Sequence, residues 1–169
     1  DGSWQPPEGR KGWSTDMAKG EAFNLTAYIA WGLAHAGEPS EEAGRWLAAR
    51  VADVEDPYGL ALATLAFLRA DPDAGIGHAT AARLAASATR DADGVSWVPA
   101  GSTGVGARGH TAQIETTALA IQALLLDGRQ RLLAYDGLER LIQWRGKDGR
   151  FGTTQSTILS LKALLAADA

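Results

Sequence analysis

The side chains that could do chemistry in this chain are three histidines and a few isolated carboxylates. His35, His78 and His110 stand far apart, whereas a zinc site needs three or four ligands at suitable spacing. The chain contains no cysteine, which excludes disulfides, thiolate metal ligands and a cysteine nucleophile. We therefore expect no catalytic residue, no metal site and no cofactor site, and we interpret the histidines as helix-end or loop residues.

Two acidic stretches and one glutamate are further candidates for metal binding or catalysis. Asp71–Asp73 and Asp91–Gly94 resemble the start of a calcium loop, but neither continues to the distal Glu that an EF-hand requires, so turns are favoured. Glu115 lies near the start of a predicted helix. A catalytic carboxylate normally needs a partner in a contrasting environment, and none is identifiable, so stabilisation of the helix N-terminus is the simpler interpretation.

Composition limits the class of protein. The 169 residues suffice for one domain, taken as 1–169, and the net charge of −4 argues against a phosphate-binding surface for nucleic acid. No apolar run approaches the roughly 20 residues of a membrane span. No signal peptide is visible, and we interpret Asp1 as a cut point inside a longer protein.

Helical periodicity dominates the chain. It predicts seven helices, at about 23–36, 40–54, 57–70, 78–89, 112–126, 129–144 and 154–167. Ser40 and Asp56 are the predicted caps of the second and third helices, and we expect an interruption of the sixth helix at Asp136-Gly137. Residues 1–20 read as an irregular entry, residues 91–110 as a long Gly-rich loop, and no stretch reads as an alternating strand.

Four of these helices share one phrase, which indicates a repeat. The phrases are 25–33, 57–65, 116–124 and 156–164, with Thr26, Tyr58, Thr117 and Thr157 at equivalent positions. Apolar and amphipathic helices that alternate at this period predict stacked helical hairpins, with the apolar helices inside. The expected fold is all-α, a partial α/α toroid of about seven helices. Leu62, Ile121 and Leu161 should share its core.

Hydroxyl and indole side chains leave further alternatives open. The threonines at the starts of the phrase helices could line a polar mouth, although capping and back-bonding are favoured; they are Thr26, Thr116, Thr117, Thr153, Thr154 and Thr157. Tryptophans are expected to be packing anchors, with Trp13 and Trp97 as the two that could contact a ligand. The loop at 91–110 could contact a partner or could be a spacer.

Three phrases in order resemble the thioester-containing domain of the alpha-2-macroglobulin and complement family. Residues 149–164 resemble its last helix, with Gly149, Gly152, Thr154, Gln155 and Thr157 at the signature positions. Residues 114–120, with Glu115 and Thr117, resemble its Val-Glu-x-Thr-Ala helix. Residues 23–33, with Thr26, resemble its Leu-Thr-Ala helix.

This resemblance implies a function and a context. The family's Cys-Gly-Glu-Gln thioester motif is missing, so the chain looks like the C-terminal part of the domain, of a bacterial type. Gly12 falls near the position of the histidine that the complement branch uses. The implied role is a non-enzymatic scaffold and docking part of a secreted or cell-envelope protease trap. The implied partners are neighbouring β-sandwich domains and a trapped protease.

Two other functions share this architecture. A terpene cyclase or prenyltransferase would need an Asp-rich motif or a zinc site, and a helical-repeat adaptor would need only a concave face. If the ring is incomplete, apolar sides of the end helices, such as those near Leu25 and Tyr28, should be exposed. We expect either residues 1–20 or a second copy of the chain to cover them.

Overall fold

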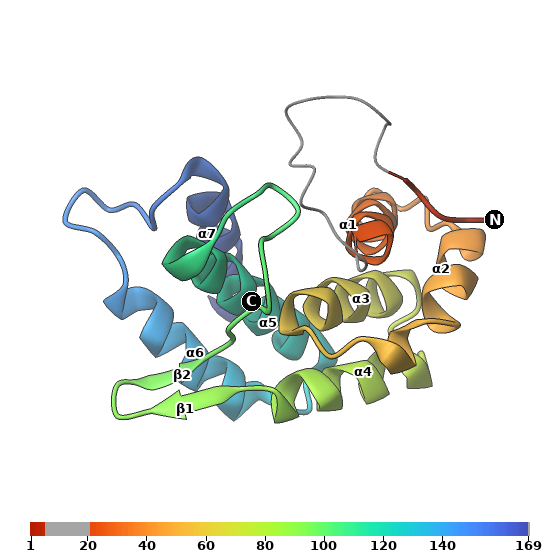
Figure 1. Ribbon diagram of the computed structural model, residues 1–169. Coiled ribbons are helices and arrows are strands. Elements are labelled where there is room, and N and C mark those ends of the chain that lie inside the picture. Colours follow the sequence, from red (N-terminus) through yellow and green to blue (C-terminus); the bar gives the residue numbers. More distant parts are fainter. Residues whose placement is uncertain (6–20, 169) are drawn as a thin grey trace.

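A computed structural model describes residues 1–5 and 21–168 of the chain (Figure 1). The described residues form seven α-helices, a short 3₁₀ helix at Val51–Asp53 and one two-stranded hairpin. The helices are α1 (Glu21–His35), α2 (Glu41–Ala48), α3 (Pro57–Ala70), α4 (Gly75–Ala86), α5 (Gly109–Asp127), α6 (Arg131–Gln143) and α7 (Thr154–Asp168). The hairpin strands are β1 (Thr89–Asp91) and β2 (Gly94–Ser96).

Local signals account for several helix ends. The Ser40 hydroxyl accepts the Ala43 N–H at 3.3 Å and caps α2. Asp56 caps α3, where Pro57 occupies the first turn and has no N–H to satisfy. Gly128 ends α5 at a φ of 75°, a left-handed conformation that glycine adopts without strain. These caps confirm the predicted starts of α2 and α3.

The helices form two layers along an arc. Helix α1 packs on α3, α3 on α5, and α5 on α7, so the four phrase helices make one inner row. The other layer consists of α2 against α1, α4 against α3 and α5, and α6 against α5. Figure 1 shows α1 and α7 at the two ends of this row, and Lys162 Nζ of α7 lies 5.5 Å from the centre of the Trp31 ring of α1. We call the exposed faces of these two end helices the open side. The fold is therefore all-α and toroid-like, as the repeat predicts.

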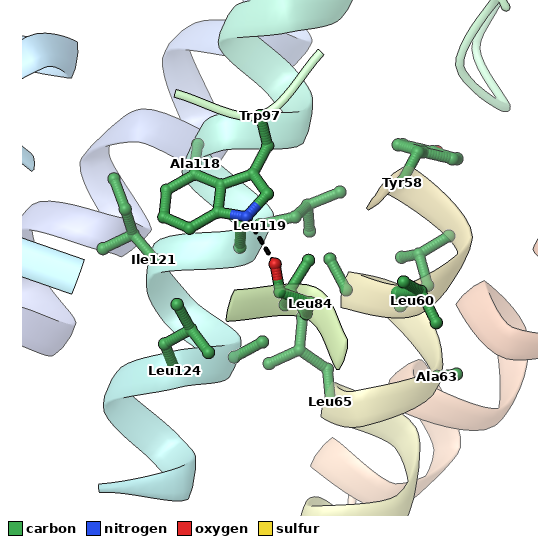
Figure 2. Packing of buried hydrophobic residues seen from close by; sticks show 14 of the residues in the cluster. Tyr58, Leu60, Ala63, Leu65, Leu84, Trp97, Ala118, Leu119, Ile121 and Leu124 are labelled. Carbon is green, nitrogen blue, oxygen red and sulfur yellow. Dashed lines mark hydrogen bonds between the residues drawn. The ribbon is translucent and has the colours of Figure 1, made fainter. Parts of the chain in front are cut away.

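The core lies between the inner helices and their outer partners. Leu62 and Ile121 are fully buried in one continuous cluster with Trp97, shown in part in Figure 2. Leu161 does not join them and is 49% exposed, which corrects our expectation. The buried side of α7 instead carries Ser156, Leu159, Ser160 and Ala163.

The two end helices expose apolar side chains, as expected for an open row. Tyr28 on α1 is 41% exposed and Leu165 on α7 is 71% exposed. Ile158 and Leu161 lie at helical spacing from Leu165 on α7, and each is about half exposed. Of the predicted cover, residues 6–20 lie outside the described residues.

The hairpin is a feature that we did not predict. It occupies the end of the predicted fourth helix and the start of the Gly-rich segment, where the Asp93 N–H bonds the Asp91 carboxylate at 2.9 Å. Gly94 then takes a φ of 135°. Each strand has three residues, too few to show alternation, and β1 is exposed throughout. Helix α5 begins at Gly109, so the loop proper is shorter than 91–110.

Helix α6 runs without the interruption that we expected at Asp136-Gly137. Gly137 is buried inside the helix, and a Cβ built there would lie 2.8 Å from the Trp97 ring. The glycine therefore serves close packing and does not break the helix.

Candidate functional site at the starts of the inner helices

Three loops are fixed to the inner helices by the same contact. In each, an aromatic residue donates its backbone N–H to a threonine hydroxyl of an inner helix, and we call these contacts the loop clamps. The pairs are Trp4 with Thr26 at 3.0 Å, Trp97 with Thr117 at 3.1 Å and Phe151 with Thr157 at 3.1 Å. Because the three threonines occupy equivalent repeat positions, the repeat preserves a contact as well as a hydrophobic pattern.

A turn precedes each clamped aromatic residue. The sequence has Asp-Gly two or three positions before Trp4, Trp97 and Phe151. All three glycines have positive φ, at 81° for Gly2, 135° for Gly94 and 83° for Gly149. Asp-Gly followed by an aromatic residue is thus a second repeat of this sequence, and sequence reasoning missed it.

Trp97 is the most deeply placed of the clamped residues. It is fully buried, and its indole Nε1 donates to the Leu84 carbonyl oxygen of α4 at 2.8 Å (Figure 2). The Thr117 hydroxyl contacts the backbone of Trp97 from α5. Trp97 therefore anchors the β2 segment to three helices, which corrects its assignment as a ligand-contacting tryptophan. Trp13 lies outside the described residues.

The start of α7 uses its hydroxyls for capping and for the clamp. The Thr153 hydroxyl accepts the Ser156 N–H at 3.2 Å, and the Ser156 hydroxyl donates to the Phe151 carbonyl oxygen at 2.6 Å. Gly152 has a φ of 90° before the helix. The two remaining signature residues carry no such contact: Thr154 is exposed and Gln155 is half-buried. Capping therefore explains Thr153, while Thr157 belongs to the clamp.

Tyr58 replaces threonine at the fourth equivalent position and contacts a later part of the connection that follows Trp97. Its hydroxyl oxygen accepts the Gly104 N–H at 3.1 Å. Burial raises the pKa of Tyr58 to about 12, and the Gly104 N–H opposes this rise. Tyr58 is thus a neutral anchor for the segment between β2 and α5.

Glu115 is buried in the second turn of α5, with no exposed surface. Neither carboxyl oxygen has a hydrogen-bond partner of good geometry, although the Thr103 hydroxyl approaches and opposes the shift in pKa. Burial dominates and raises the pKa of Glu115 above its usual range. We expected a charged residue that stabilises the helix N-terminus, whereas burial favours the neutral acid.

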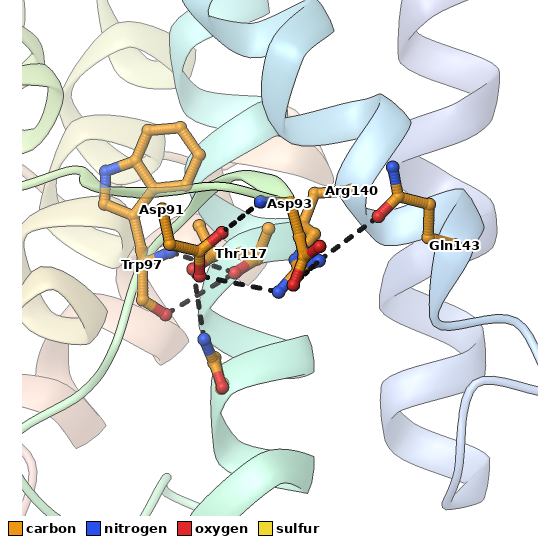
Figure 3. A network of polar contacts seen from close by, with 8 residues as sticks. Asp91, Asp93, Trp97, Thr117, Arg140 and Gln143 are labelled. Atoms are coloured by element: carbon orange, nitrogen blue, oxygen red, sulfur yellow. Dashed lines mark hydrogen bonds and ion pairs between the residues drawn. The ribbon is translucent and has the colours of Figure 1, made fainter.

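The acidic turn at Asp91–Gly94 serves an ion-pair network (Figure 3). Arg140 of α6 reaches Asp91 and Asp93 at 3.5 Å each and also donates to Gln143. Its guanidinium lies 5.1 Å from the centre of the Trp144 ring. The arrangement ties the hairpin to α6, in agreement with the interpretation as a turn.

The three histidines lie in separate places. His78 Nδ1 is 2.7 Å from the buried Asp127 carboxylate, His110 packs edge-on against Trp144, and His35 is exposed at the end of α1. Within the described ranges, no three His, Cys, Asp or Glu side chains are grouped so that they could hold a metal ion. Across those ranges, no helix has the length and hydropathy to cross a membrane.

Comparison with known families gives the same assignment as the repeat phrases. No individual curated protein matches the chain. The family model of the A-macroglobulin TED domain matches residues 2–166, which include every loop clamp and all of the inner row except the last two residues of α7. This match favours the first of the three functional hypotheses over a terpene cyclase or an adaptor. The chain belongs to the A-macroglobulin TED domain family.

Proposed function

We propose that this chain is a non-catalytic scaffold and docking part of a macroglobulin-type protease trap. The observation that carries the proposal is the family match over residues 2–166. The loop clamps support the scaffold role, because they fix three loops to the inner row. The chain has no cysteine, so a thioester in the parent protein would have to come from another segment.

The open side is the proposed contact with the rest of the ring. Tyr28 on α1 and Leu161 and Leu165 on α7 expose apolar surface there. Helical hairpins of the parent protein that precede this chain would bury these side chains and complete the toroid. A second copy could bury the same surface, so sedimentation of the complete parent protein as a monomer would favour the first arrangement.

The setting of the parent protein follows from the same family assignment. We propose a bacterial-type trap that acts outside the cell or in the cell envelope, next to β-sandwich domains of its own chain. The sequence has Gly12 near the position of the complement-type histidine, and Gly12 lies outside the described residues. The proposed chemistry of the parent is therefore direct acyl transfer to an amine, without histidine assistance.

The test is a size-selective activity assay on the complete parent protein. An endopeptidase is mixed with a molar excess of the parent protein. Its activity is then measured on a small peptide substrate and on a large protein substrate. A trap should leave cleavage of the small peptide intact and suppress cleavage of the large protein. Equal cleavage of both substrates with and without the parent would contradict the proposal.

A further inference from the structure

Glu115 and the loop that covers it form a unit to which the scaffold role assigns no task. The covering segment at 98–108 joins β2 to α5. Thr103 is buried in this segment beside Glu115. The Thr103 N–H donates to the Ala107 carbonyl oxygen at 2.9 Å, and the Ala107 N–H donates to the Thr103 hydroxyl at 3.2 Å. This turn therefore closes over the carboxyl group.

Two contacts from α3 hold the same segment down. The Tyr58 hydroxyl accepts the Gly104 N–H, and a Cβ at Gly104 would lie 3.2 Å from that hydroxyl. The Asp56 carboxylate accepts the Ala100 N–H at 2.9 Å. The segment is thus attached at both of its halves to α3 and has Glu115 of α5 beneath it.

The ionised form of Glu115 is energetically unfavourable beneath this segment. Glu115 has no exposed surface and no hydrogen bond of good geometry, and among the described residues no cation lowers its pKa. The titratable group facing it from α3 is Tyr58, which stays neutral until about pH 12 and is itself faced by Tyr28 and Asp56. An ionised Glu115 could regain its hydration only if the segment above it moved away.

We propose that Glu115 is a proton-dependent latch for the segment at 98–108. With the carboxyl group protonated, the segment stays closed over Glu115 and attached to Tyr58. When the proton leaves, the carboxylate seeks water, and the segment opens at the mouth where the inner helices begin. The latch would thus expose the starts of α3 and α5 in response to rising pH.

The test is hydrogen exchange on the full natural chain, from about pH 5 to about pH 8, corrected for the intrinsic pH dependence of exchange. If opening requires ionisation, the opening constant of segment 98–108 should rise, by up to about tenfold per pH unit, between the ordinary pKa of Glu and the raised pKa of Glu115. Peptides from α3 should show no such rise. A segment whose opening constant is independent of pH would overturn the proposal.

Variants make the assignment specific to Glu115. Glu115→Gln keeps the shape and cannot ionise, so its segment should show no pH dependence of opening. His110→Gln is the matched control, because His110 lies five residues before Glu115 on α5, packed on Trp144. It should retain the wild-type slope.

A further variant separates the latch from the anchor. Tyr58→Phe removes the acceptor of the Gly104 N–H, so the segment should open more at every pH while the slope remains. A wild-type slope in Glu115→Gln, or loss of the slope in His110→Gln, would assign the proton to another group and contradict the latch. None of these results depends on whether the parent protein traps a protease.

Discussion

The Trp97 indole fills the space that a side chain at Gly137 would need. A Cβ at Gly137 would lie 2.8 Å from Trp97 Cζ3 and 3.3 Å from Ile121 Cγ1. This contact brings α6 close to the inner row and explains a glycine in the middle of a continuous helix. The pairing of Trp97 and Gly137 therefore links the hairpin, the outer helix α6 and the inner helix α5.

Gly137→Ala should destabilise the domain. Overpacking of a core site costs about 1–3 kcal/mol, and alanine returns at most about 1 kcal/mol of helix propensity. We expect a net loss of about 1–2 kcal/mol in the free energy of unfolding by chemical denaturation.

Gly32→Ala is the matched control for that substitution. Gly32 also lies inside a helix, but it is exposed and a Cβ there would meet nothing within 4 Å. Helix propensity alone should act, and we expect a gain of roughly 0.5–1 kcal/mol. Equal effects of the two substitutions would refute the close packing of Trp97 on α6.

Thr117→Val should test the loop clamps. Valine keeps the shape of threonine but cannot accept the buried Trp97 N–H, and an unsatisfied buried donor costs about 1–3 kcal/mol. The change should lower the free energy of unfolding by that amount and speed exchange of the Trp97 amide. Thr117→Ser, which keeps the hydroxyl, should retain that amide's protection. Thr154→Val, on an exposed residue of α7, should have no measurable effect.

His78→Ala should lower the free energy of unfolding, because it leaves the buried Asp127 carboxylate without its His78 partner. Asp127 would keep only the Arg129 N–H at 3.1 Å, so the loss should be about 1–3 kcal/mol. The double substitution His78→Ala with Asp127→Ala should cost less than the sum of the single ones, because the two side chains interact. Additive losses would mean that the 2.7 Å contact contributes nothing. His35→Ala, on an exposed histidine, should be neutral.

Glu115 predicts how global stability depends on pH. Its pKa is raised in the folded chain, so the folded chain holds its proton in a range where the unfolded chain has lost it. The contribution is therefore complete below the ordinary Glu pKa and is lost as the pH rises through the raised value. In Glu115→Gln, thermal stability should fall less between about pH 5 and about pH 8 than in the wild type. Parallel stability curves for the two proteins would contradict a raised pKa.

The sequence predicts the helical fold well because its signals are local. Ser40 and Asp56 are cap residues that mark helix starts. The phrase that contains Thr117 recurs in four helices, with apolar residues at helical spacing. The contacts that cross between elements could not be read in this way. Gly137 looks like a helix breaker until Trp97 is found beside it.

In the candidate site, too, local features could be predicted from the sequence and contacts between elements could not. Glu115 lies near a helix start, which in isolation favours a charged, solvated side chain, whereas burial in the folded chain raises its pKa. The loop clamps, by contrast, had a signal that was overlooked. Asp-Gly before Trp4, Trp97 and Phe151 is visible in the sequence, although its pairing with the threonines requires the fold.

The scaffold role is tested most directly by hydrogen exchange on the complete parent protein before and after cleavage by a protease. The account predicts that the amides of Trp97 and Phe151 and of the inner helices keep their protection, while changes are confined to outer surfaces and the open side. Loss of protection throughout the inner row after cleavage would contradict it.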